Sequence, residues 1–237
     1  MSKSAITFWC CATALLGAVL NFVRAEPPAT AVSVDSPSAK WEKDIAAFEA
    51  ADKVSPPPQR AILFIGSSTI RMWKSLATDF PHHNVINRGF GGSELADAVY
   101  FADRIVIPYK PRLIVLFAGT NDLNNGKSPD RVLADFKEFV AKVRAVLPDV
   151  RIAYLGISPA PSRWAQAEEQ KQANRLIKQY AQSLKNADYI DEWDQFLGAD
   201  GQPREDLYLD DRLHSNAKGY QIRAEIVRPH LGEPNKP

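Results

Sequence analysis

The stretch that decides the fold is Ala61-Ile-Leu-Phe-Ile-Gly-Ser-Ser-Thr-Ile70, an apolar run that stops abruptly at small polar residues. Its first five residues are continuously apolar, which is typical of a strand that is buried on both faces. The chain repeats this arrangement downstream, with apolar runs at residues 85–86, 113–117, 152–155 and 189–190. The five runs predict five short strands.

Amphipathic segments separate the apolar runs. The spacing of their apolar residues predicts a first helix around Trp41, Ile45 and Phe48 and later helices over residues 94–106, 130–147, 164–184 and 216–227. The segment 130–147 has one apolar stripe, formed by Val132, Phe136, Phe139, Val140 and Val143. Strands that alternate with helices indicate an α/β fold in which helices cover both faces of a parallel sheet.

The first 25 residues have the order of a secretory signal peptide. Lys3 precedes a mostly apolar run over residues 5–20, and Ala25 supplies a small residue at the expected cleavage site. The apolar run is shorter than the roughly 20 residues that a membrane-spanning helix needs. We therefore expect residues 1–25 to be removed and the protein to be secreted or periplasmic, with no stable insertion in a membrane.

The two cysteines of the chain, Cys10 and Cys11, both lie in this predicted signal peptide. The mature protein should therefore contain no disulfide. A lipoprotein attached through one of them is the less favoured alternative, because neither follows the small-residue pattern expected before a lipidated cysteine.

Residues 26–39 are rich in Pro, Ala, Ser and Thr and predict a flexible linker. One folded domain is expected over residues 40–233, which is long enough to bury a core without disulfides. The full chain has 29 Lys and Arg against 28 Asp and Glu. A charge so evenly balanced argues against a nucleic-acid partner.

Small and polar residues follow three of the predicted strands where the strands end. The first strand runs into Gly66-Ser-Ser68, the second into Asn87-Arg-Gly-Phe-Gly-Gly-Ser93, and the third into Gly119-Thr-Asn-Asp122. A fourth polar block, Asp211-Arg-Leu-His214, lies near the C-terminus. Because ligands of such sheets bind at the carboxyl ends of the strands, we expect these blocks to meet at one edge.

The four blocks resemble those of the SGNH (GDSL-like) hydrolase superfamily, over nearly all of the chain from about residue 60 onward. The resemblance implies a three-layer α/β/α domain with a flavodoxin-like, five-stranded parallel sheet, and hydrolysis of esters or thioesters. The glycine-rich second block, the Gly-Thr-Asn segment and the closing His-x-x-x-x-Gly-Tyr are also similar to the catalytic subunits of platelet-activating-factor acetylhydrolases.

The resemblance also implies roles for five residues. Ser68 corresponds to the nucleophile, Asp211 and His214 to the other members of a catalytic triad, and Ser68, Gly92 and Asn121 to the oxyanion hole. These residue types suit acyl transfer, because a serine hydroxyl needs a base to take its proton and a neutral imidazole can do so. A carboxylate orients that imidazole, and N–H donors stabilise the oxyanion that develops.

One position departs from the family pattern, and other chemistries find little support. Ser67 stands where the family usually has aspartate, which leaves open how the nucleophile loop is braced and which substrates are preferred, since that carboxylate takes no part in acyl transfer. No metal is expected, because His82 and His83 lack a third ligand at suitable spacing. No cofactor is expected either, and the glycine-rich second block lacks the Gly-Lys-Ser/Thr ending of a phosphate loop.

The leading hypothesis is an exported acylesterase that cleaves short, acetyl-type esters of small molecules or carbohydrates. No apolar insertion is long enough to form a lid or an acyl tunnel, which favours small acyl groups. A lysophospholipase or thioesterase could use the same residues. A non-catalytic carbohydrate-binding relative is the alternative outside the enzymes, and the presence of Ser68, Gly92, Asn121 and His214 together argues against it.

Overall fold

The computed structural model describes residues 37–233, so the predicted signal peptide and residues 26–36 of the predicted linker lie outside the described part. Five parallel strands form one sheet in the order β2-β1-β3-β4-β5. Their bounds are β1 (Ile62–Gly66), β2 (Val85–Gly89), β3 (Leu113–Phe117), β4 (Arg151–Leu155) and β5 (Ala187–Ile190). This is the flavodoxin-like strand order, and it confirms the predicted fold class.

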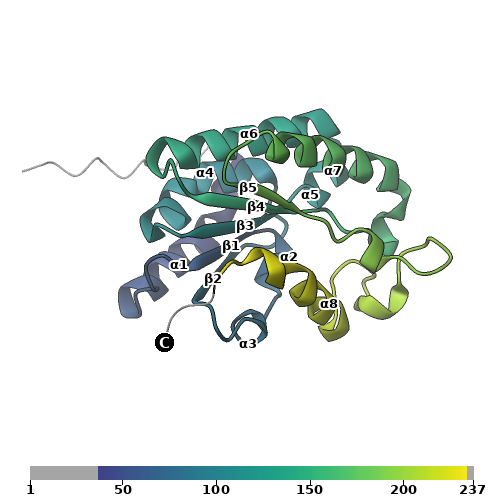
Figure 1. Ribbon diagram of the computed structural model, residues 1–237, viewed down its shortest axis with the longest axis horizontal. Coiled ribbons are helices and arrows are strands. Elements are labelled where there is room, and N and C mark those ends of the chain that lie inside the picture. The colour runs from purple at the N-terminus through teal and green to yellow at the C-terminus, as the bar shows by residue number, and fades with distance from the viewer. Residues whose placement is uncertain (1–36, 234–237) are drawn as a thin grey trace, which may run out of the picture.

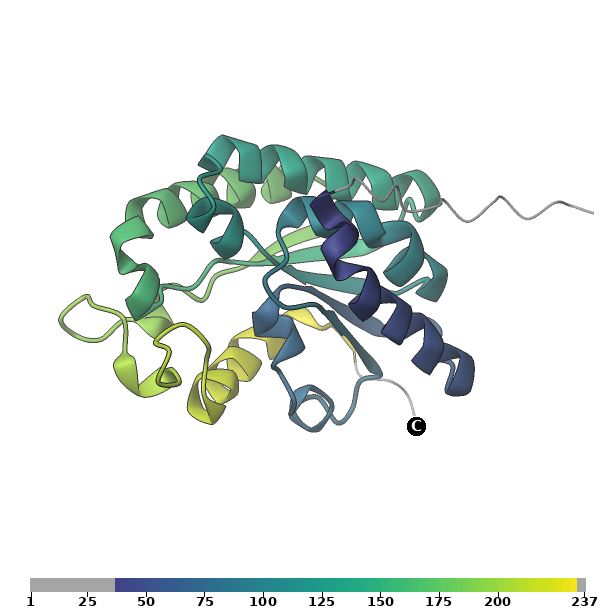
Figure 2. The ribbon, with the colours of Figure 1, turned by 180° about the vertical axis from the view of Figure 1, so that it is seen from behind.

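Helices cover both faces of the sheet and give the molecule three layers, as Figure 1 shows. One face packs against α1 (Glu42–Val54), α4 (Leu95–Ile105), α6 (Pro129–Val146) and α7 (Ala167–Gln182). The other packs against α2 (Ser68–Arg71), α3 (Leu76–Asp79) and α8 (Ala217–Val227). Figure 2 shows α1 lying beside α4. None of the helices between residues 37 and 233 is long and apolar enough to cross a membrane.

Short elements lie mainly at the ends of the sheet. The α-helix α5 (Thr120–Asn124) follows β3 directly. The 3-10 segments are η1 (Pro37–Trp41), η2 (Ile107–Tyr109), η3 (Pro161–Gln166), η4 (Asp194–Phe196), η5 (Glu205–Leu207) and η6 (Arg228–His230). Between β5 and α8 the chain therefore has no long regular element, and this segment supplies one wall of the site described below.

Alternate residues of each strand point to opposite faces and build two apolar clusters. In β1, Leu63 and Ile65 pack toward α4 and α6, whereas Ile62 and Phe64 pack toward α3 and α8. Every residue of β1 and β3 is buried, which the continuous apolar runs predict. The predicted stripe on α6, from Val132 to Val143, is buried as well.

Several predicted elements have different bounds in the structure, and two of them differ by three residues at one end. The helix predicted over residues 164–184 begins as the 3-10 segment η3, with Pro161 at its first position, and becomes an α-helix only at Ala167. Strand β2 continues past the predicted residues 85–86 to Gly89, because its polar residues also find partners. Arg88, for example, pairs with Asp52 of α1.

Candidate active site

Ser68 lies at a tight transition from β1 into α2. Gly66 has a φ of +140°, and a Cβ there would lie 1.8 Å from the carbonyl oxygen of Phe117 on β3. Only glycine allows this close approach of the two strands. Ser67 is buried and donates its backbone N–H to the same carbonyl at 3.1 Å. The loop is thus braced through the backbone of Ser67, at the position where the family usually has an aspartate side chain.

His214 comes from the loop before α8 and meets Ser68, from which it is separated by 146 positions in the chain. Its Nε2 lies 2.9 Å from Ser68 Oγ, and its Nδ1 lies 2.6 Å from Asp211 Oδ2. Asp211 Oδ1 also accepts the backbone N–H groups of Leu213 and His214, each at 2.9 Å. The three side chains form one hydrogen-bonded line from carboxylate to hydroxyl.

The carboxyl group of Asp211 is held in its ionised form. Partial desolvation raises its pKa, but the hydrogen bonds from the His214 ring and from the backbone of His214 and Leu213 outweigh it, and the pKa falls to about 2. Asp211 is therefore negatively charged at neutral pH. A fixed negative charge at Nδ1 stabilises an imidazolium whenever Nε2 takes up a proton.

Asn121 and Gly92 come from the ends of the two neighbouring strands. The Asn121 side-chain amide donates to the carbonyl oxygen of Ser93 at 3.0 Å, and this contact joins the third block to the second. Asn121 lines the same cavity as Ser68 and His214, whereas Gly92 does not line it. Gly92 has a φ of +77°, and it is next to the Ser93 that Asn121 contacts.

Asp122 holds the third block in place and has no contact with the cavity. It is fully buried and accepts backbone N–H groups from Leu95, at the start of α4, and from Gly119. Lys127 Nζ lies 3.0 Å from its carboxylate. Burial raises the pKa of Asp122, and the positive charge of Lys127 opposes that rise. These contacts fix the short helix that presents Asn121.

The cavity beside Ser68 is small, at about 20 Å³. Its wall includes the apolar side chains of Phe117, Ala160 and Leu213 together with hydroxyl groups such as that of Thr120. A single water molecule needs roughly 10–15 Å³ on this measure. The space beside Ser68 is therefore only slightly larger than one water molecule.

A buried ion pair that the sequence analysis did not single out lies at the back of the cavity. Arg223 of α8 and Glu192, which follows β5, are 2.8 Å apart and both fully buried. Arg223 also donates to Ser215 Oγ at 3.0 Å and to Ser158 Oγ at 3.2 Å. Because Ser215 is next to His214, the pair ties the loop that bears the imidazole to the ends of β4 and β5.

The C-terminal helix α8 also reaches the nucleophile segment directly. The hydroxyl of Tyr220 donates to the backbone carbonyl of Thr69 at 2.9 Å. Tyr220 packs its ring against Trp73, with ring centroids 5.5 Å apart. The segments that bear Ser68 and His214 are therefore joined by more than the contact between those two side chains.

The adjacent residues His82 and His83 do not form a metal site with other residues in the described part of the chain. Nδ1 of His83 lies 2.9 Å from a guanidinium nitrogen of Arg112. Over residues 37–233, no three His, Cys, Asp or Glu side chains gather in a way that could hold a metal ion.

Comparisons with known proteins identify the family. The model of the GDSL-like lipase/acylhydrolase family matches residues 66–222. The chain is 26% identical over 183 residues to platelet-activating factor acetylhydrolase IB subunit alpha1 of Rattus norvegicus, a match that covers 72% of this chain and 73% of that protein.

Two solved structures share the fold. A GDSL-like lipase from Bacteroides thetaiotaomicron superposes with a TM-score of 0.65 and 18% identity, covering 82% of this chain and 97% of that one. A catalytic mutant of an acetylxylan esterase from Geobacillus stearothermophilus gives a TM-score of 0.62 and 17% identity, covering 74% and 95%. Since the family model extends over most of the sequence, this chain belongs to the GDSL-like lipase/acylhydrolase family and is a carboxylic ester hydrolase.

Proposed function

We propose that the protein is an exported serine esterase that removes short, acetyl-type acyl groups from carbohydrate esters. Ser68 is the nucleophile and His214 is its general base. Asp211 orients the His214 ring and stabilises its protonated form. The observation that carries this proposal is the distance of 2.9 Å between Ser68 Oγ and His214 Nε2. It lies within the reach that proton transfer between a nucleophile and its base requires.

The reaction proceeds in two halves. As Ser68 Oγ bonds to the acyl carbon, His214 Nε2 takes the hydroxyl proton, and Asp211 stabilises the resulting imidazolium. The carbonyl oxygen becomes an oxyanion that accepts hydrogen bonds from the backbone N–H group of Ser68 and from the Asn121 amide, which lines the cavity. The resemblance to the family assigns a third donor to the backbone N–H group of Gly92, although Gly92 does not line that cavity. The alcohol leaves with the proton from His214. Water then attacks the acyl-enzyme with the same base, which releases the carboxylate and restores Ser68.

The size of the cavity supports a short acyl group. A space of about 20 Å³ next to Ser68, bounded by Phe117 and Leu213, accommodates a methyl-sized substituent, whereas a long acyl chain would have to extend out of this space. The names of two similar proteins point the same way, since one is an acetylhydrolase and the other an acetylxylan esterase. The similarity to the acetylxylan esterase also supports a carbohydrate as the alcohol part of the ester.

Export is proposed from the sequence of residues 1–25 alone. Lys3, the apolar run over residues 5–20 and Ala25 have the order of a cleavable signal peptide. N-terminal sequencing of the protein from the culture medium or periplasm of an expressing bacterium tests this assignment. A new N-terminus at Glu26 is expected, and an intact Met1 on exclusively intracellular protein would contradict it.

The proposed specificity is tested with p-nitrophenyl esters from acetate to laurate. We expect kcat/KM to be highest for acetate and to fall at least about tenfold by butyrate, since each methylene that does not fit weakens transition-state binding. The enzyme should also release acetate from acetylated xylan. A rate on laurate or on a lysophospholipid that equals the rate on acetate would replace this proposal with a lipid hydrolase. Ser68→Ala serves as the blank throughout.

A further inference from the structure

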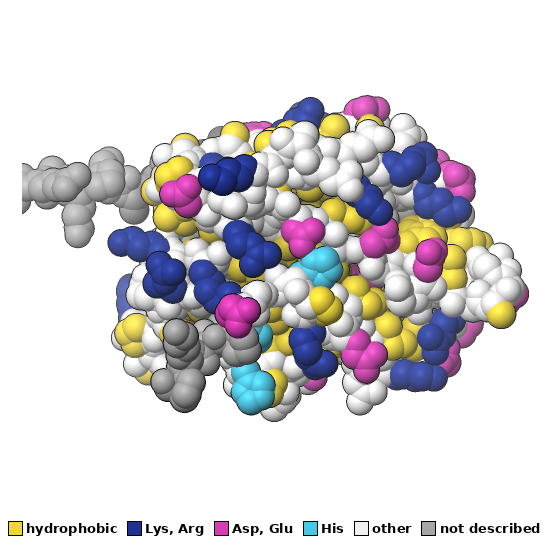
Figure 3. Space-filling view, in the orientation of Figure 1, with side chains coloured by type: hydrophobic (Ala, Val, Ile, Leu, Met, Phe, Trp, Pro, Cys, Tyr) yellow, Lys and Arg dark blue, Asp and Glu magenta, His cyan; other side chains and the backbone are white. Residues whose placement is uncertain are grey.

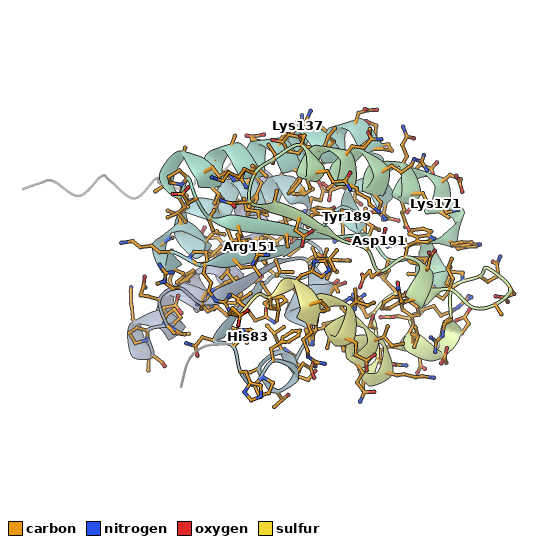
Figure 4. All side chains as sticks on the ribbon, in the orientation of Figure 1. His83, Lys137, Arg151, Lys171, Tyr189 and Asp191 are labelled. Carbon is orange, nitrogen blue, oxygen red and sulfur yellow. The ribbon has the colours of Figure 1, made fainter. Side chains whose placement is uncertain are left out.

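A second concave surface lies at the amino ends of the strands, at the opposite end of the sheet from Ser68. This amino-end groove has a volume of about 480 Å³ and is lined by residues 60, 110–112, 146–151 and 186. Its residues come from the loops that lead into β1, β3, β4 and β5. Figure 4 labels Arg151 at the start of β4, one of the lining residues.

The groove has an excess of positive charge. Four lining residues are cations, Arg60, Lys110, Arg112 and Arg151, whereas Asp149 is the acid among them. No ion pair joins any of the four cations to a carboxylate within residues 37–233. In Figure 3, dark blue Lys and Arg side chains gather at the left of the face, where the strands begin.

Two of these cations are held in place by neutral partners. Arg112 donates to the carbonyl oxygens of Leu231 at 2.8 Å and Glu233 at 3.2 Å, and Arg151 donates to the carbonyl of His230 at 3.3 Å. Carbonyl oxygens orient a guanidinium without cancelling its charge. Desolvation lowers the pKa of Arg112, and the charges of Arg151 and Arg60 lower it further, as expected where like charges face one another.

The other two cations are exposed and occupy unusual backbone positions. Arg60 has a φ of 57° and Lys110 a φ of 45°, the left-handed region in which a non-glycine residue is strained. Asn186, which also lines the groove, has a φ of 57°. Glycine would adopt these conformations at a lower free-energy cost. The long cationic side chains at positions 60 and 110 therefore point to a function for these side chains.

We propose that the amino-end groove binds an acidic polysaccharide and so anchors the enzyme to a polymer while the Ser68 site at the other end of the sheet stays open. Guanidinium groups match carboxylates in a bidentate manner. Between the cations lie the apolar side chains of Pro111, Val146 and Pro148, and Val146 is 57% exposed. Such surfaces contact the C–H faces of sugar rings while the cations bind the acidic groups.

Other polyanions fit the groove less well. Single-stranded nucleic acids are bound largely by stacking of bases on aromatic side chains, and no aromatic residue lines this groove. A linear carbohydrate polymer with regularly spaced carboxylates satisfies both the shape and the charge.

The test is affinity electrophoresis of the full protein in gels that contain polygalacturonate, with neutral xylan as the reference polymer. We expect retardation by polygalacturonate alone, abolished by about 0.5 M NaCl because salt screens exposed charges. The double variant Arg60→Gly/Lys110→Gly should bind about tenfold more weakly. Glycine relieves the strain at both positions, so this variant should be at least as stable as the wild type, and loss of binding cannot be attributed to unfolding.

The matched control is Lys43→Ala/Lys137→Ala, which removes two positive charges from exposed lysines outside the groove and should still bind. Undiminished binding by Arg60→Gly/Lys110→Gly, or no retardation of the wild type, would overturn the proposal. Equal binding to polyglutamate or to anionic phospholipid vesicles would also overturn it, in favour of a general anion site. Hydrolysis of p-nitrophenyl acetate by the same samples reports on the Ser68 site separately and should not change.

Discussion

The two ends of the same sheet use charge in opposite ways. At the carboxyl ends of the strands, ionisable groups are hydrogen-bonded to one another at short distance, as in Asp211 with His214 and Glu192 with Arg223, around a cavity of about 20 Å³. At the amino ends, cations without carboxylate partners among the described residues surround an open groove of about 480 Å³. Pairing fixes the positions of side chains, as catalysis demands, and leaving cations unpaired keeps their charge available to a ligand.

The largest effect should come from the carboxyl end. Ser68→Ala removes the oxygen that His214 contacts, and we expect kcat on p-nitrophenyl acetate to fall by about 10⁴-fold or more with little change in the thermal transition. Initial rates and calorimetry measure both quantities. Lys110→Ala, at the other end, is the control and should keep the wild-type rate. If Ser68→Ala retained more than a tenth of the wild-type activity, catalysis could not be assigned to Ser68 at the carboxyl ends of the strands.

Removing one charge of the buried pair should have the largest effect on stability. Glu192→Gln leaves Arg223 without a counter-charge in a fully buried position, which costs about 3–5 kcal/mol of unfolding free energy. Urea denaturation measures this cost. At the amino end, truncation of exposed Arg60 should change stability by no more than about 0.5 kcal/mol.

The double variant Glu192→Met/Arg223→Met separates charge from packing. Replacing both buried charges with apolar side chains of similar size is often close to neutral, so the double variant should be more stable than Glu192→Gln. Equal instability of both variants would mean that shape, and not charge, makes this cluster important.

Asn121→Ala should reduce turnover by about 10²- to 10³-fold, the usual cost of losing one oxyanion donor, with little change in KM. The comparable change at the amino end, Asn186→Ala, should leave turnover unaffected. Steady-state kinetics on p-nitrophenyl acetate measure both. A loss below about threefold at Asn121 would assign its amide to the contact with Ser93 alone.

The smallest expected effect is the pH dependence of the stability that ionised Asp211 contributes. Its pKa in the folded protein, about 2, lies below the ordinary value of 3.8, so ionised Asp211 stabilises the fold above about pH 4 and loses this contribution as the pH falls through 2. The difference in melting temperature between wild type and Asp211→Asn should therefore shrink from pH 5 to pH 2. The side chain is 47% exposed, so the difference should be modest. A constant difference over that range would contradict the assignment.

Sequence reasoning predicted the parts of the molecule that leave a local pattern. Continuous apolar runs mark β1, β3 and β4 because these strands are covered on both faces. Three of the four polar blocks supply Ser68, Asn121, Asp211 and His214, whereas Gly92 of the second block does not line the cavity. The exact start of α7 was missed because Pro161 favours a 3-10 turn before the regular helix. The end of β2 was missed because Asn87 and Arg88 are polar residues whose partners lie elsewhere in the chain.

Features that depend on distant residues could not be predicted. Arg223 and Glu192 are 31 positions apart, and an arginine on an amphipathic helix gives no sign that it is buried. The amino-end groove likewise collects cations from separate loops, none of which forms a basic cluster in the sequence. In both cases the tertiary fold, and not a motif, creates the feature.

The separation of 146 positions between Ser68 and His214 has a consequence for the timing of activity. In the proposed mechanism, Ser68 leaves the ribosome long before His214, so a growing polypeptide holds a hydroxyl without the base that would deprotonate it. By the same mechanism, a product truncated before residue 214 would contain all five strands and yet be inert. The enzyme becomes competent only when its last helix docks, which makes esterase activity a direct readout of completed folding.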